Sequence, residues 1–151
     1  MCCKFFSGRQ FLAPSDIKRI EGAGITDFYE KKPGFSFFTL KEKEGYCVFY
    51  DHAKRKCTIY AIRPADCRFF PYDILRKGSK YYWIKWKLES ADASCHLFES
   101  INDEDFLKDL EEFLPGFMEH IDEYADYTDA MIKSGESTFK LLREIRFGKK
   151  K

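Results

Sequence analysis

The chain has 151 residues, of which 44% are hydrophobic and 18% aromatic, so it is long enough for one domain with an aromatic-rich core. Its 26 basic and 25 acidic residues leave a net charge of +1, which argues against a nucleic-acid partner. No stretch approaches the roughly 20 apolar residues that cross a membrane, and the first residues lack the pattern of a secretory signal. We therefore expect a cytoplasmic protein that binds neither nucleic acid nor membrane.

The first part of the chain predicts short elements. A helix is expected to begin after Ser15 and to end at Gly22 or Gly24, and a second helical piece is expected over 27–32. The aromatic-rich runs 35–40 and 45–50 predict two strands.

The middle of the chain predicts a turn, a helical turn and a hairpin. The polar residues 51–56 form the turn that leads to Cys57, and Pro64 is expected to start a short helical turn. The runs 72–76 and 80–86, separated by a turn at 77–79, predict a β-hairpin.

From residue 102 the pattern becomes helical. Asn102 precedes three acidic residues, as is typical of a helix N-terminus, and an apolar face follows over 106–114. Pro115 and Gly116 interrupt this helix. A second helix is expected to carry the stripe Phe117, Ile121, Tyr124, Thr128 and Met131, and a third to carry Phe139, Leu142 and Ile145.

These elements predict an α+β fold. Residues 1–98 form an aromatic-rich strand and hairpin region that carries the cysteines, and residues 99–151 form a helical extension packed on it. We expect both regions to belong to the same compact domain.

Six cysteines in a reducing compartment indicate metal binding or redox chemistry. Cys47, Cys57 and Cys67 are spaced ten residues apart, each beside a turn or a break, where the backbone can direct side chains to one point. They do not form the close pairs of a zinc ribbon. The spacing therefore leaves open that some are buried thiols that only pack in the core, above all Cys47.

Several neighbours of these cysteines suit a metal site. His52 and His96 are alternative fourth ligands of a mixed zinc site. Arg63 and Arg68 would balance the charge of clustered thiolates, as would Lys56, although Arg63 could equally form a structural salt bridge with Asp66 or Asp73. The apolar side chains of the segment are expected to shield the metal from water or to pack in the core: Ile59, Tyr60, Phe69 and Phe70.

The segment C-V-F-Y…K-C-T-I-Y-A-I-R-P-A-D-C-R-F-F-P resembles the signature of the zinc- or iron-chelating, YkgJ-like cysteine-cluster family. The matching residues are Cys47, Cys57, Ile59, Tyr60, Arg63, Pro64, Cys67, Arg68, Phe70 and Pro71. The resemblance covers roughly residues 2–97: Cys2 and Cys3 resemble the family's opening cluster, and Cys95 its later cysteine. The first cysteine of that opening cluster has no counterpart here, which leaves the number of ligands open.

The resemblance implies a metal-binding protein with a redox, sensing or metal-handling role. It implies zinc or an iron–sulfur cluster as the cofactor and six cysteines as ligands: Cys2, Cys3, Cys47, Cys57, Cys67 and Cys95. Arg63 and Arg68 would lie beside the metal. Two alternatives stay open: a metal–thiolate enzyme, since flagellin lysine methylases carry a similar cluster, and a structural zinc module. The sequence does not decide whether the chain is an enzyme.

Overall fold

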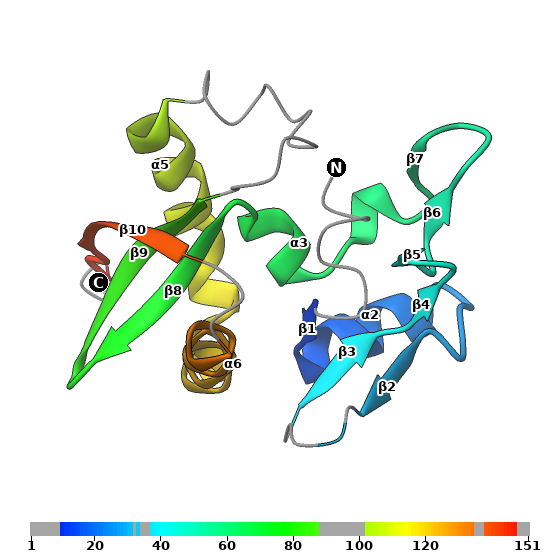
Figure 1. Cartoon of the computed structure of the whole chain (residues 1–151), viewed down its shortest axis with the longest axis horizontal. Coiled ribbons are helices and arrows are strands. Elements are labelled where there is room, and N and C mark those ends of the chain that lie inside the picture. The colour runs from blue at the N-terminus through cyan, green and yellow to red at the C-terminus, as the bar shows by residue number, and fades with distance from the viewer. Residues whose placement is uncertain (1–9, 32, 34–36, 88–101, 135–137, 148–151) are drawn as a thin grey trace. The chain divides into compact units, whose positions relative to one another are not determined.

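The computed structural model describes residues 10–31, 33, 37–87, 102–134 and 138–147 (Figure 1). The chain divides into two compact units, Met1–Phe70 and Pro71–Lys151. Both units contain strands as well as helices, which confirms the α+β class. None of the helices in these residues is both long and apolar enough to cross a membrane.

The described strands of the first unit form three small antiparallel sheets. The largest has the order β1-β3-β2 and consists of β1 (Phe11–Leu12), β3 (Phe38–Leu40) and β2 (Tyr29–Lys31). Two hairpins follow: β4 (Glu42–Lys43) with β5 (Tyr46–Cys47), and β6 (Tyr50–Asp51) with β7 (Lys56–Cys57). The expected strand over 45–50 is thus two short strands that belong to different hairpins.

The turn between β4 and β5 explains why a hairpin forms there. Its two residues, Glu44 and Gly45, have φ values of 55° and 79°. Two successive left-handed residues form the type of turn whose twist matches that of an antiparallel pair. The turn directs Cys47 back alongside Glu42, its partner in the register.

Helix α2 (Pro14–Gly22) begins earlier than expected. Its N-cap is Ala13, so the prediction that the helix starts after Ser15 is wrong. Pro14 occupies the first turn, where no amide is needed, and the Asp16 carboxylate accepts the amide of Ala13 at 3.1 Å. The predicted end is confirmed, since the helix stops at Gly22.

The helical piece expected over 27–32 is instead strand β2. Asp27 has a φ of 59°, which is incompatible with a right-handed helix. The strand pairs with β3, so that Tyr29 lies opposite Leu40 and Lys31 opposite Phe38. Backbone pairing with a neighbouring strand has therefore overridden a weak local helical preference.

The second unit starts with the predicted hairpin. It consists of β8 (Tyr72–Lys77) and β9 (Lys80–Lys87), joined by a turn in which Gly78 has a φ of 61°. The third helix expected over Phe139, Leu142 and Ile145 is instead β10 (Thr138–Glu144), which pairs with β9. A helix this short is marginal by itself, whereas the strand pairs with β9 from Thr138 to Glu144, with one irregularity between Leu141 and Arg143.

The two predicted helices of the second unit are confirmed. Helix α5 (Asp103–Phe113) starts at Asn102, whose side chain accepts the amides of Glu104 and Asp105. The 3-10 turns η2 (Leu114–Gly116) and η3 (Met118–His120) interrupt the chain before α6 (Ile121–Lys133). Four side chains of the expected stripe lie on α6 and are buried: Ile121, Tyr124, Thr128 and Met131. The expectation that Phe117 belongs to this helix is wrong, because Phe117 lies between η2 and η3, although it too is buried.

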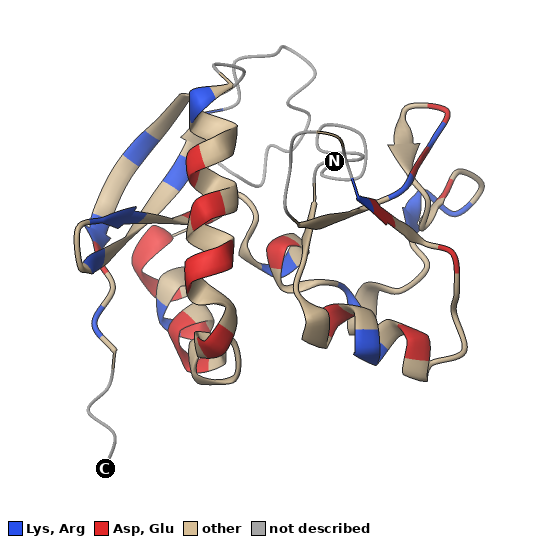
Figure 2. Ribbon diagram, turned by 90° about the horizontal axis from the view of Figure 1, so that it is seen from below, with Lys and Arg blue, Asp and Glu red and all other residues tan. Residues whose placement is uncertain are grey.

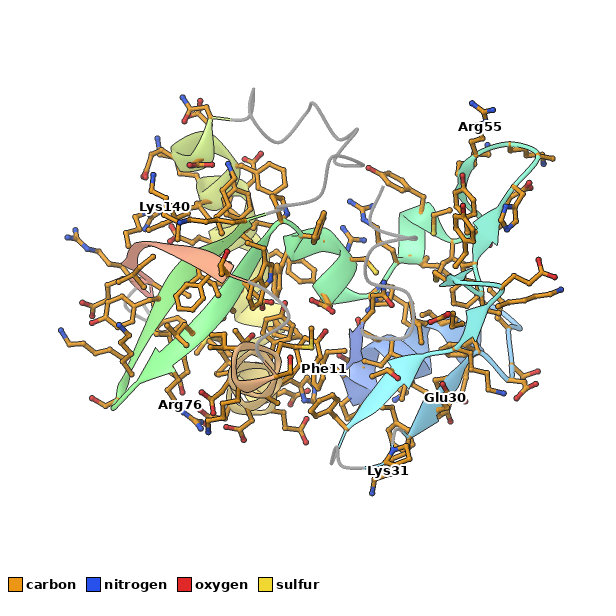
Figure 3. All side chains as sticks on the ribbon, viewed as in Figure 1. Phe11, Glu30, Lys31, Arg55, Arg76 and Lys140 are labelled. Atoms are coloured by element: carbon orange, nitrogen blue, oxygen red, sulfur yellow. The ribbon has the colours of Figure 1, made fainter. Side chains whose placement is uncertain are left out.

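The hairpin is buried between these helices. Tyr72 stacks on Phe106 of α5, whereas the next residue, Asp73, is bonded to Thr128 of α6. Because adjacent strand residues point to opposite faces, the two helices cover opposite faces of β8. Figure 2 shows acidic residues along α6, and Arg76, labelled in Figure 3, forms ion pairs from β8 with two of them, Asp122 and Asp126.

Candidate metal centre

The structure describes three of the six cysteines, and each lies on a different element. Cys47 ends β5 and is 5% exposed. Cys57 ends β7, opposite Tyr50, and is half-buried. Cys67 lies in the short helix α3 (Ala65–Phe69) and is also half-buried. Cys2, Cys3, Cys95 and His96 lie outside the described residues.

All three described cysteines share one hydrophobic core. Cys47 belongs to it, and Cys57 and Cys67 pack against it. The other buried members come from the whole length of the unit: Leu12, Ile20, Phe28, Leu40, Phe49 and Ile59. The fold therefore gathers at a single core three thiols that are separated by twenty residues of sequence.

These thiols do not by themselves complete a metal site. Within the described parts of the chain, no group of three or more His, Cys, Asp or Glu side chains could hold a metal ion.

A buried aspartate fixes the start of the segment that carries Cys67. Asp16 of α2 is 1% exposed, and its Oδ1 accepts the amide of Ala65 at 3.2 Å. The same oxygen accepts the Arg19 guanidinium at 2.7 Å, which balances the buried charge. Sequence reasoning missed Asp16, because nothing in its local context predicts a contact with a residue 49 positions away.

A second carboxylate ties the same helix to the sheet. Asp66 Oδ2 accepts the amide of Phe11 at 2.8 Å. Helix α3 has only five residues and could not be stable alone. Its position depends on these two carboxylates, and so does the position of Cys67.

Arg63 is held by Tyr60. Its guanidinium carbon lies 4.0 Å from the centre of the Tyr60 ring, and its Nη1 donates to the Tyr60 carbonyl oxygen at 2.7 Å. Of the two salt bridges considered from the sequence, the one between Arg63 and Asp66 is not formed within the described residues, where Asp66 accepts the amide of Phe11. The alternative with Asp73 stays a prediction.

Positive charge gathers around this segment. Arg19 Nη2 donates to the carbonyl oxygen of Arg63 at 3.0 Å, and Arg68 Nη2 donates to that of Ala61 at 3.1 Å. Burial, and then the charges of Arg63 and Arg19, lower the pKa of Arg68. Three guanidinium groups therefore surround η1 (Tyr60–Ile62) and α3, with the Asp16 carboxylate as a buried negative partner.

The aromatic and aliphatic neighbours of the cysteines separate into two groups. Ile59 and Phe69 are buried, as the shielding or packing roles require. Tyr60 is 65% exposed and carries Arg63 over its ring, so the expectation that it packs in the core is wrong, and Phe70 is half-buried. A shielding role for either ring stays a prediction.

His52 lies in an aromatic cluster beside two of the cysteine-bearing strands. The rings of Tyr46 and Tyr50 are stacked with centroids 5.0 Å apart. The His52 ring meets them edge-on at 4.6 and 4.9 Å. This packing fixes the orientation of the imidazole without requiring a metal.

A surface pocket of about 510 Å³ lies next to Cys57. It extends over β6, β7 and η1, and its lining residues are Asp51, Lys54, Lys56, Cys57, Thr58, Tyr60 and Ala61. The sequence predicts a polar turn over 51–56 before Cys57. The pocket itself could not be predicted, because it forms only where folding brings η1 next to that turn.

Comparison with known families identifies the region that carries this core. Residues 1–96 match the model of the CxxCxxCC family, described as "Putative zinc- or iron-chelating domain". The match covers more than half of the chain and includes all six cysteines. The chain belongs to the CxxCxxCC family.

A curated relative of this CxxCxxCC protein is itself uncharacterised. The chain is 35% identical over 84 residues to the uncharacterized protein MJ0661 of Methanocaldococcus jannaschii, covering 52% of this chain. The chain spans 46% of the length of that relative. No solved structure matches this chain.

The chemistry of the donors fits the metals in the family description. Thiolate sulfur is a preferred ligand of zinc and the usual ligand of iron–sulfur clusters. The three described thiols of the first unit contact one core, and Arg19, Arg63 and Arg68 lie close enough to one another for the first two to lower the pKa of Arg68. The described residues therefore include donors of the type that either metal binds.

Proposed function

We propose that the first unit holds zinc or an iron–sulfur cluster through cysteine thiolates. Cys47, Cys57 and Cys67 are the proposed ligands among the described residues, with Cys2, Cys3 and Cys95 as their companions. The observation that carries the proposal is that Cys47 belongs to one core and that Cys57 and Cys67 pack against the same core, within the region that matches the chelating family.

The charges around Cys67 support this assignment. Several thiolates on one metal carry net negative charge, and buried charge is costly unless it is balanced. Arg63 and Arg68 flank Cys67, and Arg19 is bonded to the backbone of Arg63. A negative metal–thiolate group would offset the repulsion among these guanidinium groups, which lowers the pKa of Arg68.

The pocket beside Cys57 favours a role in metal handling. A purely structural zinc site gains nothing from a ligand that outside molecules can reach. Cys57 lines an open pocket, which supports exchange of the metal with its surroundings. Redox and sensing roles require the same access. In each case the thiols must stay reduced, so we place the protein in the cytoplasm.

Purification without oxygen, followed by elemental analysis and a visible spectrum, tests the proposal. A brown protein with iron and sulfide would identify an iron–sulfur cluster, whereas a colourless protein with stoichiometric zinc would identify a zinc site. Metal-free protein, with every thiol open to labelling, would overturn the proposal.

Single Cys→Ser variants test the ligands. We expect Cys57→Ser and Cys67→Ser to lose the metal, whereas Cys2→Ser is expected to keep it because the adjacent Cys3 remains available. Thr58→Ser is the matched control, because it alters the residue after Cys57 without removing a thiol. If Cys67→Ser holds as much metal as the unchanged protein, the assignment of ligands is wrong.

A further inference from the structure

Cys57 faces two environments. On one side it packs against the core that contains Cys47, which is only 5% exposed. On the other side it lines the surface pocket of about 510 Å³. Pockets of this size hold small organic ligands, whose usual sites are about 300–1,000 Å³. A molecule in the pocket would therefore touch a proposed metal ligand without entering the core.

The wall of the pocket carries more positive than negative charge. Lys54 and Lys56 line it, and both side chains are exposed. Asp51 also lines it and offsets part of this charge; its Oδ1 accepts the amide of Lys54 at 3.0 Å, and this hydrogen bond lowers the pKa of Asp51. The ring of Tyr60 forms another part of the wall and carries the Arg63 guanidinium 4.0 Å from its centre. This combination favours a small anion with several carboxylates.

We propose that the pocket binds a small polycarboxylate metal chelate, and that metal enters and leaves the site by ligand exchange at Cys57. This inference rests on the proposed function. On entry, a metal–carboxylate bond of the chelate breaks as the bond from the metal to Cys57 Sγ forms. The thiol proton passes to solvent, each remaining metal–carboxylate bond is replaced in turn by a bond to another proposed thiolate, and the chelator leaves with all its carboxylates free. Release of metal follows the reverse order, with no change in oxidation state.

The first experiment measures the rate of metal removal from zinc-loaded protein by an anionic and a neutral chelator. Nitrilotriacetate is the anionic probe and 1,10-phenanthroline the neutral one. We expect the double variant with Lys54→Gln and Lys56→Gln to slow removal by nitrilotriacetate about tenfold, and to leave removal by phenanthroline within about twofold. The zinc content at equilibrium is measured alongside, and the ratio of the two removal rates is the deciding quantity, because Lys56 lies next to Cys57 and its charge also bears on the affinity for zinc.

The matched control is Arg55→Gln. Arg55 lies between the two lysines in sequence but does not line the pocket, and Figure 3 shows it at the outer end of the β6–β7 hairpin. The Arg55→Gln substitution removes one positive charge, as does Lys54→Gln or Lys56→Gln alone. Each single lysine variant should therefore slow zinc removal by nitrilotriacetate more than Arg55→Gln does. Equal effects of all three single variants would mean that net charge alone governs the rate, which would overturn the pocket as a binding site.

A second measurement needs no metal. In metal-free protein, the modification of Cys57 is followed by mass spectrometry with an anionic reagent, Ellman's disulfide, and a neutral one, 4,4′-dithiodipyridine. The ratio of the two rates removes any change in the fraction of thiolate. We expect the double lysine variant to lower this ratio about fivefold or more. An unchanged ratio would overturn the anion site.

The two experiments separate this inference from the proposed function. If the protein holds no metal but the lysines control the ratio at Cys57, the exchange step fails while the anion pocket stands. If the protein holds metal and the lysines affect neither rate, the pocket fails while the metal site stands.

Discussion

The Thr128 hydroxyl lies between two acceptors, 2.9 Å from Asp73 Oδ1 and 3.2 Å from the carbonyl oxygen of Tyr124. Asp73 is 3% exposed, and its other oxygen accepts the indole of Trp86 at 2.9 Å. An ionised Asp73 therefore receives the Thr128 proton, whereas a protonated Asp73 can donate to Thr128, which then donates to Tyr124. This pair joins β8 to α6 in both protonation states.

The first prediction concerns this hydrogen bond. Thr128→Val keeps the shape of the side chain but removes a donor to a buried carboxylate. We expect the free energy of unfolding at neutral pH to fall by about 2 kcal/mol, as measured by urea denaturation.

Thr39→Val is the control for that measurement. Thr39 is 2% exposed, and its hydroxyl has no hydrogen-bond partner in the part of the chain that the structure describes. The same substitution there should be neutral or slightly stabilising. Equal effects at both sites would show that the Asp73–Thr128 bond contributes nothing.

The second prediction concerns pH. Burial raises the pKa of Asp73 from 3.8 to about 6, so the folded state binds this proton more tightly than the unfolded state. The contribution of Asp73 to stability is therefore fully present below pH 3.8 and falls as the pH rises to about 6, by about 3 kcal/mol in total.

The difference between the unchanged protein and Asp73→Asn isolates this effect. Asp103 and Asp122 have lowered pKa values and lose stability on acidification, but they contribute equally to both proteins. We expect the stability of the unchanged protein, relative to the variant, to decrease between pH 4 and pH 6 and then to level off. Parallel stability curves would contradict the raised pKa.

The third prediction concerns the carboxylate that holds α3. In Asp16→Asn, the new amide group faces the amide of Ala13 or Ala65 and cannot accept it. We expect the first unit to lose about 2–3 kcal/mol of stability, and the metal content to fall because α3 carries Cys67. Asp27→Asn is the control, since the Asp27 side chain is 87% exposed and its ion pair with Lys41 is on the surface. Similar losses in both variants would exclude the anchoring role of Asp16.

The fourth prediction tests the charges near Cys67. Arg68→Gln removes a half-buried guanidinium whose sequence neighbour is a proposed metal ligand. We expect the affinity for zinc, measured by competition with a coloured chelator, to fall about tenfold. Arg55→Gln should leave it within about twofold, because that charge is exposed and screened by solvent. An unchanged affinity in Arg68→Gln would mean that the arginine has only a structural role.

Local sequence signals were sufficient where each element is defined by its own residues. Asn102 with its acidic neighbours predicted the start of α5, and Pro64 predicted the helical turn that became α3. The hairpin of β8 and β9 was equally clear, because an apolar run and an aromatic-rich run flank a short turn that contains Gly78. Local sequence signals failed at β2 and β10. Each of these segments forms a strand because it pairs with the edge of another strand, β3 for β2 and β9 for β10.

The sequence by itself determined the chemistry available at the candidate site: clustered cysteines, the Arg-Pro break and the membership of a zinc- or iron-chelating family. Tertiary structure decided which of these groups meet. It brought Cys47, Cys57 and Cys67 to one core, placed the Arg63 guanidinium over the Tyr60 ring, and placed η1 beside the Lys54–Lys56 turn. These outcomes depend on long-range contacts such as that between Asp16 and Ala65, 49 residues apart, and no local pattern encodes such a contact.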